Sequence, residues 1–256
     1  MSVALRHEVT GPHDAPVLLL GSSLGTDMGM WDAQAPVLAE HLRVVRFDHR
    51  GHGGSPVPAG PYEIADFAGD VIALMDLLGV ERAHVAGISL GGMVGMWLGA
   101  NAPERVDRLV LMCTSAQMGP ASLWQERAAK VLEAGTVGVV ADAVVQRWLT
   151  PAFAAEHPEE RARLRAMLAA SPPAGYAACC GAIERMDVRP QLGRIAAPTL
   201  VVSGAEDLAT PPEHQELIAA AIPGARHETV ADAAHIAAVQ QPGIVNRLIL
   251  DHLEPA

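Results

Sequence analysis

The segment from Gly87 to Gly92, Gly-Ile-Ser-Leu-Gly-Gly, constrains the fold of this chain more than any other. It stands between Ala83–Ala86, which predicts a buried strand, and Leu90–Asn101, which predicts a helix. A turn this tight leaves no room for side chains two residues before and after the serine, so both positions require glycine. Ser89 would then stand above the carboxyl end of a sheet, at a helix N-terminus that favours developing negative charge. The segment predicts a serine nucleophile; the alternative is an ordinary glycine-rich turn.

Short apolar runs alternate with longer amphipathic segments on both sides of this turn. The other expected strands are Val17–Leu20, Arg43–Phe47, Arg108–Met112, Thr199–Ser203 and His227–Val230, and the other expected helices are Glu63–Leu78, Pro212–Ala221 and Gly243–Leu253. Strands that alternate with helices are typical of parallel sheets. The sequence therefore predicts an α/β fold with a mostly parallel central sheet and helices on both of its faces.

This alternation stops between Ser122 and Val188, where no strand-like run occurs. Helical stretches are expected there at Gln125–Ala134, Val137–Trp148, Pro158–Ala169 and Tyr176–Met186. A length of 256 residues, half of them apolar, suits one large domain that carries an insertion. We predict a core formed by residues 1–120 and 191–256, and a helical cap formed by residues 121–190, inserted after the strand that ends near Met112.

A serine nucleophile needs a base, and the base needs an orienting carboxylate. Asp207 follows the strand Thr199–Ser203, and His235 follows the strand that ends at Val230. Both are therefore expected at the same edge of the sheet as Ser89, in the chain order serine, acid, histidine that accompanies this kind of turn. The competing histidines precede the serine or lie on a helix or strand: His49, His52, His84, His214, His227 and His252. The predicted catalytic residues are Ser89, Asp207 and His235.

Two acidic residues compete with Asp207 for the orienting role. Glu206 is its neighbour in the chain, but one loop is expected to aim only one of the two carboxylates inward. Asp232 is too close in sequence to His235 to reach its Nδ1 comfortably, and we expect it in a surface turn.

The tetrahedral intermediate of acyl transfer needs two backbone N–H donors for its oxyanion. One is expected from Leu90, directly after the nucleophile. The other is expected from Ser23, in the loop after the first buried strand, with Leu24 as the alternative.

The formal net charge of −11 bears on partners and on substrate. Such a field repels phosphate backbones and anionic lipids, so neither a nucleic-acid nor a membrane partner is expected. The uncharged runs His84–Pro103 and Ala166–Ile183 are interrupted by glycine or proline and do not predict membrane spans. No signal peptide is recognised, and a cytoplasmic location is expected. An anionic substrate would need a local cation.

The cysteines Cys113, Cys179 and Cys180 form no disulfide framework, and no Cys/His spacing suggests zinc. We expect Cys179 and Cys180 to be small buried hydrophobic residues. No metal or organic cofactor is expected, because protein groups supply the nucleophile, the base and the oxyanion donors.

With these residues, the chain resembles the α/β-hydrolase superfamily over nearly its whole length, and within it the 3-oxoadipate enol-lactonases. The segments that carry the resemblance are Ser22–Thr26, Gly29–Asp32, Asp48–Gly53, Gly92-Met93, Arg147–Pro151 and Gly175–Cys180. The last two lie in the cap, where members of the superfamily differ most, whereas Asp48–Gly53 is shared widely. The chain departs from the usual superfamily pattern in having Gly21-Ser22 where His-Gly is common.

The resemblance implies hydrolysis of 3-oxoadipate enol-lactone, a small lactone that carries a carboxylate, in the β-ketoadipate pathway of aromatic catabolism. Ser89 stands where dehalogenases and epoxide hydrolases have aspartate, which argues against their chemistries. Arg127 and Arg147 are the cap cations expected at the substrate carboxylate, beside Trp124 and Trp148 as pocket walls. The alternative for these four residues is a solvated helix face or simple packing.

Two other functions stay open at this point. A broader carboxylesterase or lactonase, or a C–C bond hydrolase of ring-cleavage products, would use the same triad, and only the cap separates these from the lactonase. A catalytically silent ligand receptor would usually show a broken triad, which the sequence does not. The oligomeric state is not given by the sequence, and a homo-oligomer stays open.

Overall fold

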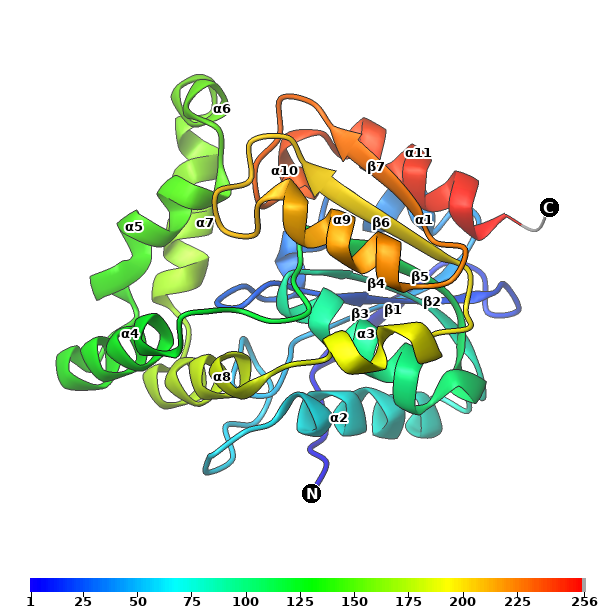
Figure 1. The fold of residues 1–256 in the computed structure, drawn as a ribbon, viewed down its shortest axis with the longest axis horizontal. Coiled ribbons are helices and arrows are strands. Elements are labelled where there is room, and N and C mark those ends of the chain that lie inside the picture. Colours follow the sequence, from blue (N-terminus) through cyan, green and yellow to red (C-terminus); the bar gives the residue numbers. More distant parts are fainter. Residues whose placement is uncertain (255–256) are drawn as a thin grey trace.

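The computed structural model describes residues 1–254, which form a seven-stranded sheet of order β1-β3-β2-β4-β5-β6-β7 (Figure 1). The strands are β1 (His7–Thr10), β2 (Val17–Gly21), β3 (Arg43–Phe47), β4 (Ala83–Ile88), β5 (Val106–Met112), β6 (Thr199–Gly204) and β7 (Arg226–Val230). All neighbours pair in parallel except β1 and β3, which are antiparallel. The predicted α/β fold with a mostly parallel sheet is confirmed. Strand β1 was not predicted, because its residues, His-Glu-Val-Thr, are mostly exposed and form no apolar run.

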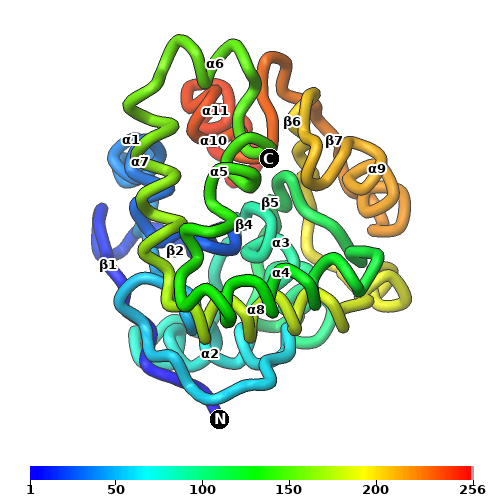
Figure 2. The backbone as a smooth tube through the Cα atoms, turned by 90° about the vertical axis from the view of Figure 1, so that its left-hand side faces the viewer, coloured from blue at the N-terminus to red at the C-terminus, as the bar shows by residue number. Residues whose placement is uncertain are grey.

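Helices cover both faces of the sheet (Figures 1 and 2). The helices of the core are α1 (Ala35–Leu38), α2 (Ile64–Leu77), α3 (Leu90–Asn101), α9 (Pro212–Ala221), α10 (Ala237–Gln240) and α11 (Pro242–Leu253), with short 3₁₀ turns η1 (Met28–Trp31), η2 (Pro103–Arg105) and η3 (Arg189–Arg194). One face carries α2, α3 and α9, and the other carries α1 and α11. The predicted bounds of α3 and α9 are confirmed. Helix α2 begins one residue later than expected, because Glu63 and Asp66 form a capping box.

A helical insert lies between β5 and β6 and covers the carboxyl edge of the sheet (Figure 1). It contains α4 (Ala121–Ala134), α5 (Gly138–Trp148), α6 (Pro151–Glu156), α7 (Pro158–Ala169) and α8 (Pro173–Arg185). Helix α6 was not predicted. Its start has a readable signal, since Thr150 accepts a hydrogen bond from the amide of Phe153 and proline occupies the first helical position.

No single helix within residues 1–254 is long and apolar enough to cross a membrane. Helices α7 and α8 meet that criterion only when taken together, and they are bent by 92° at their junction.

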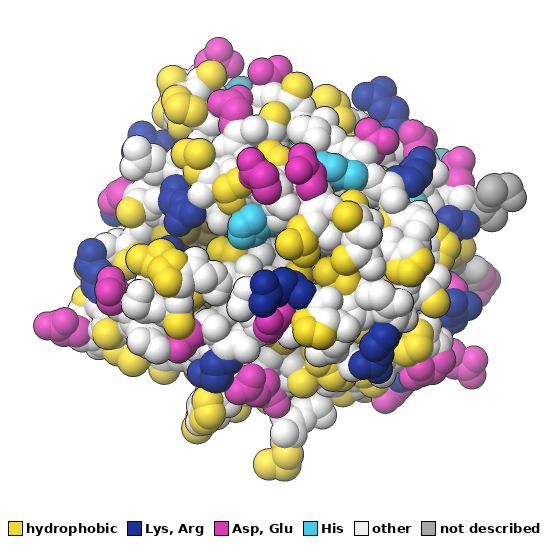
Figure 3. Space-filling view, viewed as in Figure 1, with side chains coloured by type: hydrophobic (Ala, Val, Ile, Leu, Met, Phe, Trp, Pro, Cys, Tyr) yellow, Lys and Arg dark blue, Asp and Glu magenta, His cyan; other side chains and the backbone are white. Residues whose placement is uncertain are grey.

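Charged side chains of both signs are scattered over the face seen in Figure 3. This face therefore shows no broad positive patch that would attract an anion from a distance. With a formal net charge of −11, positive charge for an anionic ligand is expected from particular side chains at its site.

The buried His49 gives the fold a dependence on pH. This residue follows β3 and is 2% exposed, with its ring edge-on to Phe47 and Phe67 at centroid distances of 5.1 and 5.8 Å. Burial, together with the neighbouring His52, lowers the pKa of His49 from 6.5 to about 3. Between these values the unfolded chain binds a proton that the folded chain does not, so acid favours unfolding.

We therefore expect the free energy of unfolding to fall as pH drops below about 6.5, by about 1.4 kcal/mol per pH unit for this histidine. His49→Asn should reduce the slope of unfolding free energy against pH by up to that amount, with the full effect reached near pH ~5. Urea denaturation across this range measures it, with His41→Asn as the control because His41 is exposed. Equal slopes in wild type and His49→Asn would contradict the assignment.

Candidate active site

Ser89 occupies a strained turn between β4 and α3. Its backbone has φ 56° and ψ −113°, a conformation that residues other than glycine rarely adopt. A Cβ on Gly87 would collide with the backbone of Gly91, and one on Gly91 would collide with Gly21, so both glycines are required by close approach. The amide of Ser89 donates to the carbonyl of Met112 at 3.0 Å, which ties the turn to the end of β5.

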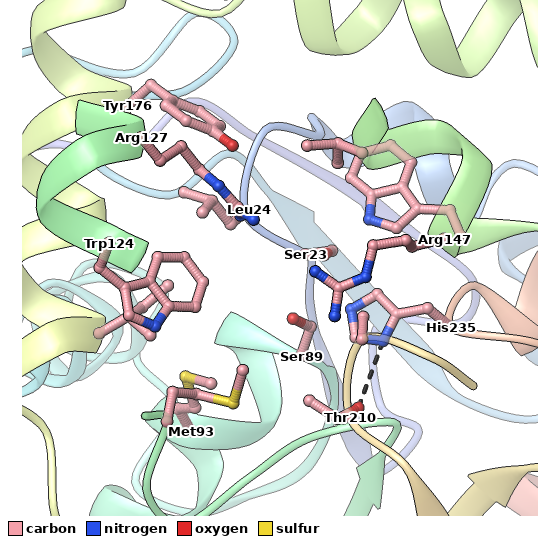
Figure 4. A pocket seen from close by; sticks show the side chains of 15 residues that line it. Ser23, Leu24, Ser89, Met93, Trp124, Arg127, Arg147, Tyr176, Thr210 and His235 are labelled. Atoms are coloured by element: carbon pink, nitrogen blue, oxygen red, sulfur yellow. Dashed lines mark hydrogen bonds between the residues drawn. The ribbon is translucent and has the colours of Figure 1, made fainter. Parts of the chain in front are cut away.

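Asp207 and His235 lie together at the same edge of the sheet. His235 Nδ1 and Asp207 Oδ2 are 2.9 Å apart, and their side chains are 4% and 0% exposed. The carboxylate of Asp207 also accepts hydrogen bonds from the amide of Ala209 at 2.7 Å and from the amide and hydroxyl of Thr210 at 2.9 and 2.8 Å. Nδ1 of His235 is thus occupied, which leaves Nε2 for the cavity that Ser89 and His235 line together (Figure 4).

These contacts also fix the charge of Asp207. Burial raises the pKa of its carboxyl group, but His235 and the hydrogen bonds from Thr210 outweigh burial, and the pKa lies below its ordinary value. Asp207 is therefore ionised at neutral pH and holds His235 in the tautomer whose Nδ1 carries the proton.

The structure separates the sequence candidates for the acid. Glu206 is exposed, whereas Asp207 is 2% exposed. Asp232 is exposed with a φ of 53° in a turn, as expected from its sequence position. Of these carboxylates, the structure joins only Asp207 to His235 within residues 1–254.

The loop after β2 is fixed from both sides. The carbonyl of Ser22 accepts a hydrogen bond from the amide of Gly91 at 3.0 Å, and the amide of Gly25 donates to Nε2 of His52 at 2.9 Å. Between these contacts lie Ser23 and Leu24, which line the cavity beside Ser89. Their amides are not among those that donate to another residue of 1–254.

The amide of Leu90 also faces no intrahelical acceptor, because Leu90 is the first residue of α3. It follows Ser89 directly, and Ser23 and Leu24 line the same cavity as Ser89, so both segments have backbone amides near the serine that are free within residues 1–254. The arrangement suits an oxyanion hole, with Leu24 still the alternative to Ser23.

His52 fixes the loop beside the cavity, a role that the sequence did not indicate. Its Nδ1 lies 3.1 Å from the carbonyl of Arg50, so Nδ1 carries the proton and Nε2 is the acceptor for Gly25. Burial lowers the pKa of His52 and keeps this tautomer neutral. The sequence signal is its place in Asp48–Gly53, but which loop it would meet depends on the folded chain.

Of the predicted residues, Ser23, Ser89, Trp124, Arg127, Arg147, Trp148 and His235 line one cavity between core and insert (Figure 4). The cavity also contains residues that the sequence did not single out as site residues: Met93, Met118, Val144, Tyr176, Ile183, Ala209 and Thr210. Most of these additions are apolar, and helical periodicity cannot distinguish a pocket wall from a core contact. Thr210 had a signal, because an Asp side chain often accepts hydrogen bonds from residues two and three places on.

Residues 1–254 contain no cluster of three or more His, Cys, Asp or Glu side chains that could hold a metal ion. Cys113, Cys179 and Cys180 are buried free thiols outside the cavity lining, as expected for the adjacent pair. Burial raises the pKa of all three, which keeps them protonated and poorly nucleophilic.

Comparison with known proteins places this geometry in a family. The alpha/beta hydrolase fold family matches residues 16–242. The 3-oxoadipate enol-lactonase 2 of Acinetobacter baylyi is 40% identical over 96% of this chain and 92% of its own length. The crystal structure of the enol-lactonase from Burkholderia xenovorans LB400 matches with a TM-score of 0.95 and 38% identity over 98% of this chain and 96% of that one. A hydrolase from Pseudomonas aeruginosa PA01 matches with a TM-score of 0.95 and 45% identity over 99% of this chain and 95% of that one. The chain therefore belongs to the alpha/beta hydrolase fold family and is a homologue of the 3-oxoadipate enol-lactonases.

Proposed function

We propose that the protein hydrolyses 3-oxoadipate enol-lactone to 3-oxoadipate through an acyl-enzyme on Ser89. The observation that carries the proposal is the cavity itself. It is lined mostly by apolar side chains, has Ser89 and His235 on its wall, and receives Arg127 and Arg147 from the insert (Figure 4). An apolar pocket with a nucleophile and nearby guanidinium groups suits a small lactone that carries a carboxylate.

In the first step, Ser89 Oγ attacks the acyl carbon of the lactone while His235 Nε2 takes the serine proton. Asp207 stabilises the imidazolium that forms, and the amides of Leu90 and Ser23 donate to the oxyanion. The bond between the acyl carbon and the ring oxygen then breaks, and that oxygen leaves as an enolate. The proton that His235 took from the serine passes to the enolate carbon, which gives the ketone and returns His235 to its neutral form.

In the second step, a water molecule attacks the ester carbon on Ser89 while His235 takes a proton from that water. The bond from the acyl carbon to Ser89 Oγ breaks, His235 returns a proton to the serine, and a carboxylate is released. Because an enolate is a good leaving group, ring opening needs little acid assistance, so His235 serves mainly as the base.

The two arginines argue for an anionic ligand. Neither forms an ion pair with an acidic residue of 1–254. Arg127 lies over the ring of Trp124 at 4.8 Å, and a guanidinium nitrogen of Arg147 donates to the carbonyl of Leu208. Burial and the charge of Arg127 both lower the pKa of Arg147, so the two cations repel each other across the cavity. A carboxylate between them would relieve that repulsion.

We expect Arg127→Ala and Arg147→Ala to lower kcat/KM for the enol-lactone by about 10- to 100-fold, since hydrogen bonds to charged groups contribute about 1.5–3 kcal/mol. The loss on the neutral ester 4-nitrophenyl acetate should be much smaller. Arg161→Ala makes the same change of charge at an exposed position on α7 outside this cavity, and is the matched control. Equal losses of kcat/KM on the lactone and the ester would show that these arginines do not bind the substrate carboxylate.

The reaction is tested with the purified protein. Loss of enol-lactone absorbance should be matched by an equimolar gain of 3-oxoadipate, identified by mass. A broader esterase or a C–C bond hydrolase would instead prefer neutral esters or ring-cleavage products, and a receptor would bind without turnover. No product from the enol-lactone would overturn the proposal.

A further inference from the structure

Tyr176 carries a buried hydroxyl group without a partner. The residue lies on α8 and is 0% exposed, yet its hydroxyl makes no hydrogen bond within residues 1–254. The other tyrosine of the chain, Tyr62, is 1% exposed and donates to the carbonyl of Pro58 at 2.6 Å. A buried hydroxyl left unpaired costs about 1–3 kcal/mol, so the position of Tyr176 needs a reason.

The hydroxyl cannot easily turn away to find a partner, because the backbone around it is tightly packed. A Cβ on Gly25 would lie 3.1 Å from the Tyr176 ring, so the ring rests against the loop that holds Ser23 and Leu24. The preceding residue, Gly175, packs on Gly51 so closely that a Cβ on Gly51 would lie 3.0 Å from the Gly175 Cα. The start of α8 is thereby fixed against the core, and Tyr176 with it.

The hydroxyl points into the cavity on the side where Arg127 lies (Figure 4). Burial raises the pKa of Tyr176, and Arg127 only partly offsets this, through its charge and its closeness to the hydroxyl oxygen, so the phenol is neutral. A neutral phenol is a hydrogen-bond donor. Tyr176 and Arg127 therefore present donors to one region, where a carboxylate could use one oxygen for each.

We propose that the Tyr176 hydroxyl and the Arg127 guanidinium form a carboxylate subsite, in which Tyr176 donates to one oxygen of the substrate carboxylate. The inference rests on the proposed function and adds Tyr176 to it as a residue that determines specificity. The carboxymethyl arm of the lactone is attached to the enol carbon of the ring. The ring oxygen separates this carbon from the acyl carbon that Ser89 attacks, so the arm points away from the point of attack. Figure 4 shows Arg147 beside His235 and Arg127 with Tyr176 across the cavity. The second pair therefore suits direct hydrogen bonds to the arm, while Arg147 acts on the carboxylate through its charge.

The test replaces each tyrosine by phenylalanine, which removes only the oxygen. Two substrates are compared: the enol-lactone, and α-angelica lactone, which has the same ring with a methyl group in place of the carboxymethyl arm. Tyr176→Phe should lower kcat/KM for the enol-lactone by about 10- to 100-fold, mainly through KM. It should change kcat/KM for the neutral lactone much less. It should not lower Tm, because no hydrogen bond within the protein is lost.

Tyr62→Phe is the matched control and should behave in the opposite way. It should lower Tm, since the hydroxyl of Tyr62 donates a hydrogen bond to the carbonyl of Pro58. It should leave the ratio of kcat/KM for the two lactones unchanged. Tyr176→Phe could instead lower kcat/KM for both lactones by the same factor, or lower Tm without changing the ratio of the two kcat/KM values. Either result would show that the hydroxyl is structural and would refute the subsite.

Binding of adipate, a dicarboxylate analogue of the product, separates this inference from the proposed function. Calorimetry should show binding to the wild-type protein that weakens at least about tenfold in Tyr176→Phe. That result would support the subsite even if the enol-lactone were not turned over. No adipate binding by the wild type, or equal affinity in both proteins, would overturn the subsite.

Discussion

Ser89→Ala is expected to lower kcat for the enol-lactone by about 10⁴- to 10⁶-fold while the protein remains folded. The fold should persist because glycines at positions 87 and 91 and the hydrogen bond between Ser89 N and Met112 O set the turn, and none of them involves the serine side chain. The residual rate would come from the backbone donors and from substrate binding, which the substitution leaves in place.

The same measurement on Ser89→Ala combined with His235→Ala tests whether the residues act as a unit. Because the base has no function without its nucleophile, the double variant should be about as slow as Ser89→Ala alone. Burst kinetics with 4-nitrophenyl acetate would report the acyl-enzyme in the wild type and its absence in both variants. Near-normal turnover by folded Ser89→Ala would exclude the proposed nucleophile.

The second large effect concerns two adjacent carboxylates, one buried and one exposed. Asp207→Asn should lower kcat by about 10³- to 10⁴-fold, because an amide that donates to Nδ1 of His235 would select the wrong tautomer. The amides of Ala209 and Thr210 would still bond to the remaining side-chain oxygen, so the loop should keep its shape.

Glu206→Gln makes the same chemical change one residue earlier, at an exposed side chain. It should leave kcat/KM within about twofold, as surface substitutions usually do. The comparison therefore separates an orienting carboxylate from a general effect of negative charge near the site. Similar losses in the two variants, or a larger loss in Glu206→Gln, would contradict the assignment of Asp207.

Much of the fold was predictable, because central parallel strands are buried and read as continuous apolar runs. Strand β3 and helices α3, α7 and α9 have the bounds that the sequence indicated. The edge strand β1 was missed, since it lies antiparallel at the edge of the sheet and is largely exposed.

The site was predictable where local sequence sets the geometry. Gly87, Ser89 and Gly91 define their own turn, and Asp207 and His235 could be placed because parallel strands end at one edge of the sheet. Nδ1 of His235 and Oδ2 of Asp207 lie 2.9 Å apart, which agrees with that placement.

What escaped prediction depends on contacts between distant segments. Nε2 of His52 accepts a hydrogen bond from the amide of Gly25, which is 27 residues away in the chain. It can accept because the carbonyl of Arg50 holds the proton of the ring on Nδ1. Tyr176 reads in the sequence as one more apolar residue of a cap helix, and only the folded chain shows its hydroxyl unpaired in the cavity. Side-chain pairing across such distances has no local signature.

The ratio of two rates tests most directly whether the protein hydrolyses a carboxylate-bearing enol-lactone in this cavity. We predict kcat/KM above about 10⁴ M⁻¹s⁻¹ for 3-oxoadipate enol-lactone, within the ordinary range of enzymes, and a far lower value for 4-nitrophenyl acetate. Slow lactone turnover beside brisk ester cleavage, or no turnover of either, would contradict it.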